Sequence, residues 1–133
     1  IILRGFAQLY EYKKYKPSMS KFLNNFSTKV KKFTQEDITL CENIFRAFTS
    51  MCVSVNPKLF YAKSTRFNIS VYEAIFVACC ESSLIDRKIE IKQITNEKIE
   101  NLKTNQDFIS STQSTTAHTQ NVETRIRLAK EIL

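Results

Sequence analysis

The sequence predicts an all-α fold, a single helical bundle of about six helices with one apolar helix at its centre. The 133 residues include one glycine and two prolines, whereas tight β-hairpins favour Asn-Gly or Asp-Gly turns. Apolar residues recur at helical spacing from Leu3 to Leu133. The chain is 43% hydrophobic, with ten Phe and five Tyr, which is enough apolar area for one core. We therefore expect residues 1–133 to form one domain.

The first two helices are separated at Lys16-Pro17. Helical dihedrals are disfavoured for the residue before a proline, so we expect the first helix to end at Lys16. Ser18 or Ser20 can cap the second helix, whose apolar stripe consists of Met19, Phe22, Leu23, Phe26 and Val30. Because the first residues already have helical periodicity, the sequence also predicts a fragment of a longer protein.

The third and fourth helices have clear start signals. Thr34, with an acidic turn after it, predicts the capped start of the longest helix, which runs to about Val55 and ends before Asn56-Pro57. Its predicted core face consists of Ile38, Cys41, Ile44, Phe45, Phe48 and Cys52. Asn68 or Ser70 caps the fourth helix, which runs to about Leu84. Nearly every side of this helix is apolar, so we place it at the centre of the bundle.

The C-terminal third is more polar. We expect a polar helix from about Asn96 to Phe108, a hydroxyl-rich loop over residues 110–121 and a last helix from Val122 to Leu133. The longest nearly apolar run of the whole chain, residues 69–80, contains Glu73 and is shorter than the roughly 20 residues that span a bilayer. The sequence therefore predicts no membrane segment.

The sequence predicts neither a metal site nor a cofactor. Cys41, Cys52, Cys79 and Cys80 form no Cys-x-x-Cys pair, and His118 is the only histidine, so the spacings typical of zinc sites are absent. Loops that bind phosphate or a dinucleotide need at least two glycines, and this chain has one. We expect the thiols to pack in the core rather than act as nucleophiles, and free thiols favour a cytoplasmic protein.

Catalytic residues are not predicted either, so we do not expect this chain to be an enzyme. His118 lies in the hydroxyl-rich segment, where we expect it to be solvated. Glu73 is the most unusual carboxylate, because apolar residues surround it on the predicted central helix. Since a buried acid needs a cationic partner, we expect a structural ion pair of Glu73 with Arg66 or Arg4 rather than a catalytic acid.

Positive charge is concentrated near the start of the chain. The formal net charge is +7, and residues 1–33 contain eight Lys or Arg against one acid, Glu11. Such a surface attracts polyanions, although lysines more often form only the solvated ends of helices. If this surface binds DNA, the binding is weak and non-specific, and the candidate residues are Lys13, Lys14, Lys16, Lys29, Lys31 and Lys32, with Arg125 and Arg127 displayed on the last helix.

Three stretches of the chain, in this order, resemble the helical region that follows the ParB/sulfiredoxin-like domain of GmrSD-type restriction proteins. The first stretch is Ile2-Leu3-Arg4-Gly5-Phe6-Ala7, with Tyr15-Lys16-Pro17-Ser18 and Phe22-Leu23-Asn24. The second is Arg66-Phe67-Asn68 with Tyr72-Glu73-Ala74, and the third is Ser114-Thr115 with Val122-Glu123-Thr124-Arg125-Ile126. Together they cover nearly the whole chain. The sequence departs from the pattern at Gly5, where a bulky apolar residue is more usual.

The resemblance implies a helical accessory module of a bacterial or archaeal anti-phage system that acts on modified DNA. In such proteins the catalytic nucleotide motif lies upstream and an HNH nuclease domain often lies downstream. This chain contains neither motif, so the resemblance assigns no catalytic residue to it.

Two functions remain open from the residues alone. The first is a non-catalytic module of a DNA restriction protein, whose basic helices hold DNA or a sister domain. The second is a protein-interaction bundle without a nucleic-acid role, which binds a partner through its long third helix or an apolar groove. Tyr10, Tyr12 and Tyr15 alternate with lysines, as in nucleic-acid binders that stack bases on aromatic rings. The same tyrosines could equally pack the first helix against the core.

Overall fold

The structure, a computed structural model, describes residues 1–61 and 66–133, and this part of the chain is all-helical. Its helices are α1 (Ile2–Glu11), the 3₁₀-helix η1 (Tyr12–Lys14), α2 (Met19–Val30), α3 (Gln35–Val53), α4 (Ile69–Asp86), α5 (Asn96–Thr104), α6 (Gln106–Gln113) and α7 (Thr119–Ile132). Within the described ranges, β-structure is limited to one isolated bridge between Tyr61 and Phe67. The predicted all-α fold is therefore confirmed.

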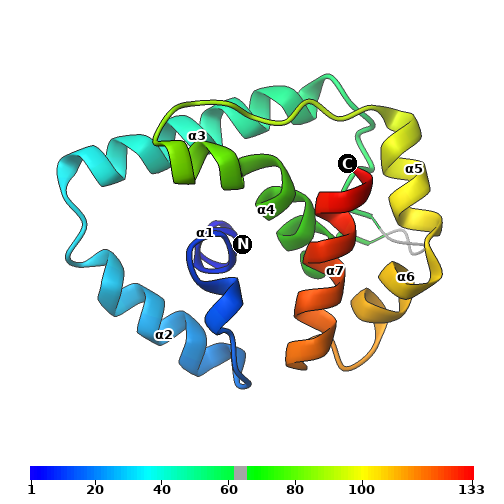
Figure 1. Cartoon of the computed structure of the whole chain (residues 1–133), viewed down its shortest axis with the longest axis horizontal. Helices are drawn as coiled ribbons and strands as arrows, with labels where there is room; N and C mark the ends of the chain where they lie inside the picture. The colour runs from blue at the N-terminus through cyan, green and yellow to red at the C-terminus, as the bar shows by residue number, and fades with distance from the viewer. Residues whose placement is uncertain (62–65) are drawn as a thin grey trace.

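Helix α4 lies among α1, α3 and α7 and contacts all three (Figure 1). Helix α2 packs against α1, while α5 and α6 pack against α7. Every residue of α4 from Ser70 to Val77 is buried, as expected for a helix that is apolar on nearly all sides. Aromatic rings fill the space around it. The ring of Phe76 meets those of Phe6 and Phe48 edge-on, with centroids 5.2 and 4.9 Å apart.

The predicted N-caps at Ser18, Thr34 and Asn68 are confirmed. Each side chain accepts a hydrogen bond from a backbone N–H group in the first turn of its helix, where such groups have no partner within the helix. The cap at Thr34 is reciprocal, because the Asp37 carboxylate accepts from the Thr34 backbone N–H. This hydrogen bond and the nearby Arg87 guanidinium lower the pKa of Asp37.

Two helix boundaries differ from the prediction. The α-helical part of the first helix ends at Glu11, and η1 continues only to Lys14 rather than to Lys16. The helix predicted over residues 96–108 is two helices, because Asn105 has an extended backbone, with φ −65° and ψ 123°. Its side chain accepts a hydrogen bond from the Phe108 N–H and so starts a new helix.

The hydroxyl-rich segment over residues 110–121 is also partly helical, whereas the sequence predicted a loop. Ser111 and Thr112 are buried in α6. Their hydroxyl groups donate to the carbonyl oxygens of Phe108 and Ile109, so the polar atoms are satisfied inside the helix. Helix α7 begins at Thr119, before the predicted start at Val122. Among the described residues there are thus seven α-helices rather than about six.

Gly5 allows α1 to lie close to the central helix. A Cβ atom at Gly5 would lie 2.5 Å from the hydroxyl oxygen of Tyr72 and 3.1 Å from the ring of Phe76. Both distances are shorter than ordinary van der Waals contacts. The glycine that departs from the resembled pattern is therefore explained by the close packing of α1 on α4.

None of the helices described here is both long enough and apolar enough to cross a lipid bilayer.

Candidate functional site

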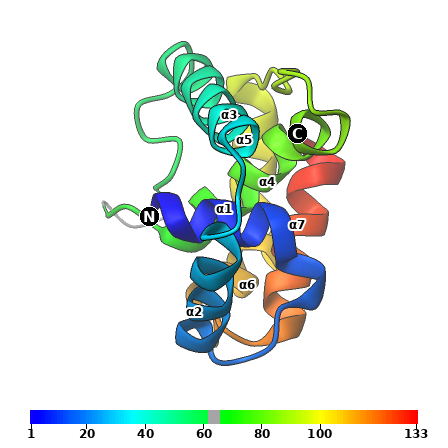
Figure 2. The ribbon, with the colours of Figure 1, turned by 90° about the vertical axis from the view of Figure 1, so that its left-hand side faces the viewer.

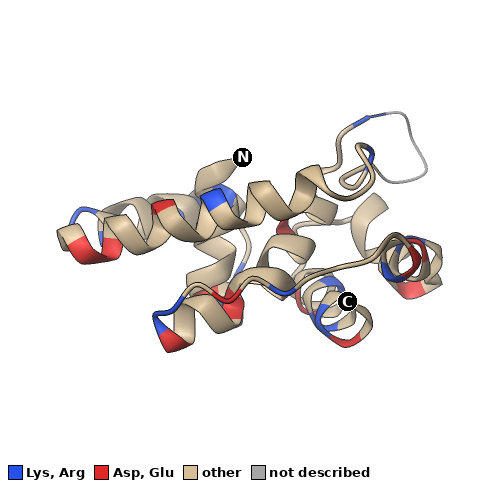
Figure 3. Cartoon of the chain, turned by 90° about the horizontal axis from the view of Figure 1, so that it is seen from above, with Lys and Arg blue, Asp and Glu red and all other residues tan. Residues whose placement is uncertain are grey.

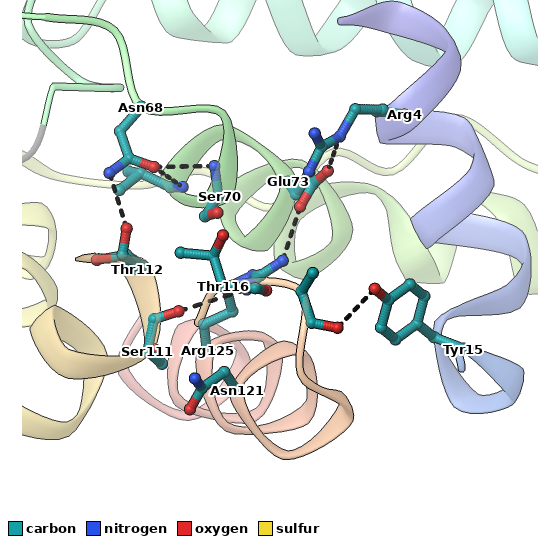
Figure 4. A network of polar contacts seen from close by, with 12 residues as sticks. Arg4, Tyr15, Asn68, Ser70, Glu73, Ser111, Thr112, Thr116, Asn121 and Arg125 are labelled. Carbon is teal, nitrogen blue, oxygen red and sulfur yellow. Dashed lines mark hydrogen bonds and ion pairs between the residues drawn. The ribbon is translucent and has the colours of Figure 1, made fainter. Parts of the chain in front are cut away.

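A buried ion network joins α1, α4 and α7 at the carboxylate of Glu73 (Figure 4). Arg4 Nε donates to Glu73 Oε1 at 2.5 Å, and Arg125 Nη2 donates to Glu73 Oε2 at 2.9 Å. The side chains of Glu73 and Arg125 are fully buried, whereas that of Arg4 is about a quarter exposed. Both carboxylate oxygens are thus taken by arginines, which favours a structural role for Glu73 over that of a catalytic acid.

Arg125 is further held by backbone carbonyl groups. Its Nη1 donates to the carbonyl oxygen of Thr116 at 2.6 Å and to that of Ser111 at 3.4 Å. Burial lowers the pKa of Arg125, although the Glu73 carboxylate opposes this shift. Both terminal nitrogens of the guanidinium group thus donate within the protein, whereas the buried Nε has no partner among the described residues.

The predicted display of Arg125 on the surface is wrong, and so is its assignment as a candidate phosphate ligand. Arg125 is fully buried, because it lies three residues after Val122 and four before Ala129, on the buried face of α7. The spacing was visible in the sequence, but the charge of the side chain favoured a surface position. Arg127 lies off that face, is exposed and pairs with Glu131 at 2.9 Å.

The sequence predicted that Glu73 pairs with Arg66 or Arg4, and in the structure it pairs with Arg4 and Arg125. Of the two candidate partners, Arg4 is confirmed, and Arg125 is a partner that the sequence analysis missed. Arg66 lies exposed in the segment before α4.

The six candidate lysines of the first third are all exposed: Lys13, Lys14, Lys16, Lys29, Lys31 and Lys32. They are not equally available to a ligand. Lys14 and Lys29 both pair with Glu11, and although burial opposes the effect, these two amines lower the pKa of that carboxyl. The Lys13 amine lies 5.7 Å from the centre of the Tyr12 ring. Lys31 and Lys32, at the turn between α2 and α3, take part in none of the salt bridges found in the described part of the chain.

The three tyrosines near these lysines pack against the protein. The Tyr10 ring lies against Phe26 and Phe33, with centroids 5.6 and 5.3 Å apart. Tyr15 is buried and donates its hydroxyl to the carbonyl oxygen of Ala117 at 2.7 Å. Tyr12 donates to the Glu81 carboxylate at 3.0 Å. These contacts favour the packing role among the two alternatives, because base stacking needs an open ring face.

The cysteines are free thiols, and Cys79 and Cys80 are buried in α4. Burial raises the pKa of Cys52 to about 11 and that of Cys79 to about 12, so neither thiol is ionised near neutral pH. His118 is exposed at the start of α7. Within residues 1–61 and 66–133, no three His, Cys, Asp or Glu side chains are grouped so that they could hold a metal ion.

An apolar groove is walled by α1, the end of α2 and the first half of α3, three helices that Figure 2 shows one above another. Its volume is about 370 Å³. One of its lining residues, Glu42, is charged. The others are Ile2, Leu3, Phe6, Phe26, Val30, Phe33, Ile38, Cys41 and Phe45. Ile2, Leu3 and Ile38 are 51%, 43% and 40% exposed, although Ile38 was predicted to face the core. We call this feature the α1–α3 groove.

The sequence left an apolar groove open as a binding feature but did not place it, because each wall of the α1–α3 groove has the spacing of an ordinary core stripe. Phe26, Val30 and Phe45 have the helical spacing that also predicts burial. The position of the opening depends on how three helices meet, and no single helix encodes that. Comparisons with protein-family models, with curated proteins and with solved structures find no match to this chain.

Proposed function

We propose that this chain is a non-catalytic interaction module, and that the α1–α3 groove holds an apolar segment of a partner protein or of a sister domain. The observation that carries the proposal is a groove lined almost wholly by apolar residues, with Ile2, Leu3 and Ile38 at its open side. Exposed apolar patches of this kind mark interaction sites in proteins.

A non-catalytic role is supported by the state of the reactive groups. The carboxylate of Glu73 is held between two arginines, and burial raises the pKa of the thiols of Cys52 and Cys79 far above neutrality. None of these groups offers an ionised nucleophile or a free general base.

Weak contact with DNA is the second candidate function. It is supported by the exposed lysines of the first third, above all Lys31 and Lys32, and by the resemblance to GmrSD-type restriction proteins. In that case the chain is an accessory module of an anti-phage protein. Arg125 and Tyr15 are buried, and the half-buried Tyr10 ring packs on Phe26, so three groups that would have strengthened a nucleic-acid surface are engaged within the protein.

Fluorescence anisotropy can separate the two functions. The probes are a labelled, uncharged amphipathic peptide of about four helical turns, with leucines at i, i+3, i+4 and i+7, and a labelled DNA duplex. We expect the peptide to bind, and Ile38→Glu in the groove to abolish binding. Ile85→Glu is the matched control, because Ile85 is 70% exposed and does not line the groove.

Binding of the peptide that is equally strong in both variants would contradict the groove proposal. Binding of DNA alone, lost when Lys31 and Lys32 are replaced by Glu, would favour the second function. In both cases circular dichroism melting establishes that each variant is folded.

A further inference from the structure

We infer that the segment held in the α1–α3 groove is an acidic amphipathic helix, with apolar residues on one face and Asp or Glu beside them. This inference rests on the proposed function, because it names the kind of partner that the same groove binds.

The apolar lining of the groove favours a helix over an extended segment. Glu42 carries the only charge among the lining residues, so the walls offer few hydrogen-bond partners to an incoming backbone. A backbone that enters apolar surroundings must therefore satisfy its own N–H and C=O groups. A helix does so internally, and it presents apolar side chains along one face at i, i+3, i+4 and i+7.

The charges around the groove favour an acidic partner. Residues 1–46, which form α1, α2 and the first half of α3, contain nine Lys and Arg but four Asp and Glu, whereas the rest of the chain contains eleven and nine. Glu11 is already paired with Lys14 and Lys29, and Asp37 with Arg87. Residues 1–46 therefore carry a formal charge of +5, nine basic minus four acidic residues, although Glu42 lines the groove and Glu36 lies in the first turn of α3.

Two exposed lysines are sequence neighbours of residues that line the groove. Lys31 follows the lining residue Val30, and Lys32 precedes the lining residue Phe33. Both lysines are exposed, and neither forms a salt bridge with another described residue. Figure 3 shows charges of both signs here, with Lys in the turn before α3 and Asp and Glu in the first turn of α3, while the rest of α3 carries few charges. An acid on a helix bound in the groove would meet these two amines at the edge of the apolar contact.

The experiment compares labelled peptides that share one leucine stripe and differ only in the residues beside it. These residues are Glu, Gln or Lys, and in a fourth peptide the leucines of the Glu form are replaced by Gln. Affinity for the intact chain is measured by anisotropy at about 50 mM and about 500 mM salt, because screening weakens ionic contacts between exposed groups. The protein variants are Lys31→Glu with Lys32→Glu, and, as a matched control, Lys16→Glu with Lys21→Glu at the opposite end of α2.

We expect the Glu peptide to bind about tenfold more tightly than the Gln peptide at low salt, and the Lys peptide to bind more weakly than both. The Lys31/Lys32 reversal should remove that advantage, and the Lys16/Lys21 reversal should leave most of it. Equal affinities for the Glu, Gln and Lys peptides would overturn the acidic partner but keep the groove as a binding site. Binding of the Glu peptide that does not need its leucines would overturn the groove itself, and so would the absence of binding by any peptide.

Discussion

Arg125 on α7 and Glu73 on α4 are both fully buried, and 2.9 Å separates Arg125 Nη2 from Glu73 Oε2. The pair ties the last helix of the chain to the helix at its centre. Arg4 brings α1 to the same carboxylate, so three helices that are distant in the sequence meet at one ion network. Because an unpaired charge in the interior is strongly unfavourable, the network restricts how these helices can pack.

The substitution Glu73→Gln should destabilise the protein by about 3–5 kcal/mol, because it leaves Arg125 as a buried charge without its counter-ion. Urea denaturation measures the free energy of unfolding. The matched control is Glu131→Gln, which breaks the exposed pair with Arg127 and should change stability by less than about 1 kcal/mol. Similar stabilities of the two variants would contradict the structural role of Glu73.

The contact between Gly5 and Tyr72 predicts a coupled effect. Gly5→Ala alone should destabilise the protein by about 1 kcal/mol, because overpacking outweighs the higher helix propensity of alanine. In a Tyr72→Phe background the loss should shrink, since the hydroxyl oxygen nearest to the new methyl group is gone. A double-mutant cycle followed by thermal denaturation measures this coupling. Additive effects would show that the two side chains are not in contact.

Gln8 is an unfavourable residue at a fully buried position. Neither of its two amide heavy atoms has a hydrogen-bond partner among the described residues. Gln8→Met keeps a similar volume and removes both polar atoms, so it should stabilise the protein by about 1–2 kcal/mol. Differential scanning calorimetry should then find a higher Tm. A lower Tm would mean that the amide is hydrogen-bonded in solution.

The thiols of Cys52, which is half-buried, and Cys79, which is buried, predict a loss of stability at high pH. An unperturbed thiol ionises near pH 8.5, whereas burial raises the pKa of Cys52 to about 11 and that of Cys79 to about 12. Above about pH 8.5 the unfolded chain therefore releases thiol protons that the folded chain keeps. Stability should stay level below about pH 8 and fall as the pH rises toward 11, which unfolding curves at several pH values can follow.

Thiol reactivity gives a second test of the same burial. At pH 8 a disulfide reagent should label Cys79 slowly in the folded chain and rapidly in urea. Labelling of Cys79 in the folded chain at the rate of a free cysteine would contradict its burial.

Much of the fold could be predicted from the sequence, because its signals are local. Helix starts at Ser18, Thr34 and Asn68 are marked by side chains that form hydrogen bonds within one turn. The apolar residues on nearly all sides of α4 indicate its burial. The break at Asn105 was missed because asparagine also occurs inside helices, and only the cap that it forms on Phe108 N–H distinguishes the two situations.

The candidate site was much less predictable. Arg125 was assigned to the surface because arginine is seldom fully buried, and its burial depends on the carboxylate of Glu73, 52 residues away in the sequence. The α1–α3 groove depends on the mutual placement of three helices. The same spacing that put Ile38 on a predicted core face therefore left it 40% exposed beside an opening.

The central claim is that the α1–α3 groove is where this chain binds its partner, and chemical-shift mapping by NMR tests it most directly. The isotope-labelled chain is titrated with the Glu-flanked leucine peptide and, separately, with a DNA duplex. We predict that the peptide shifts amides along α1, the end of α2 and the first half of α3, with the largest changes near Val30, Phe33 and Ile38. Shifts confined to helices that do not line the groove, such as α5 and α6, or shifts produced by DNA but not by the peptide, would contradict the account.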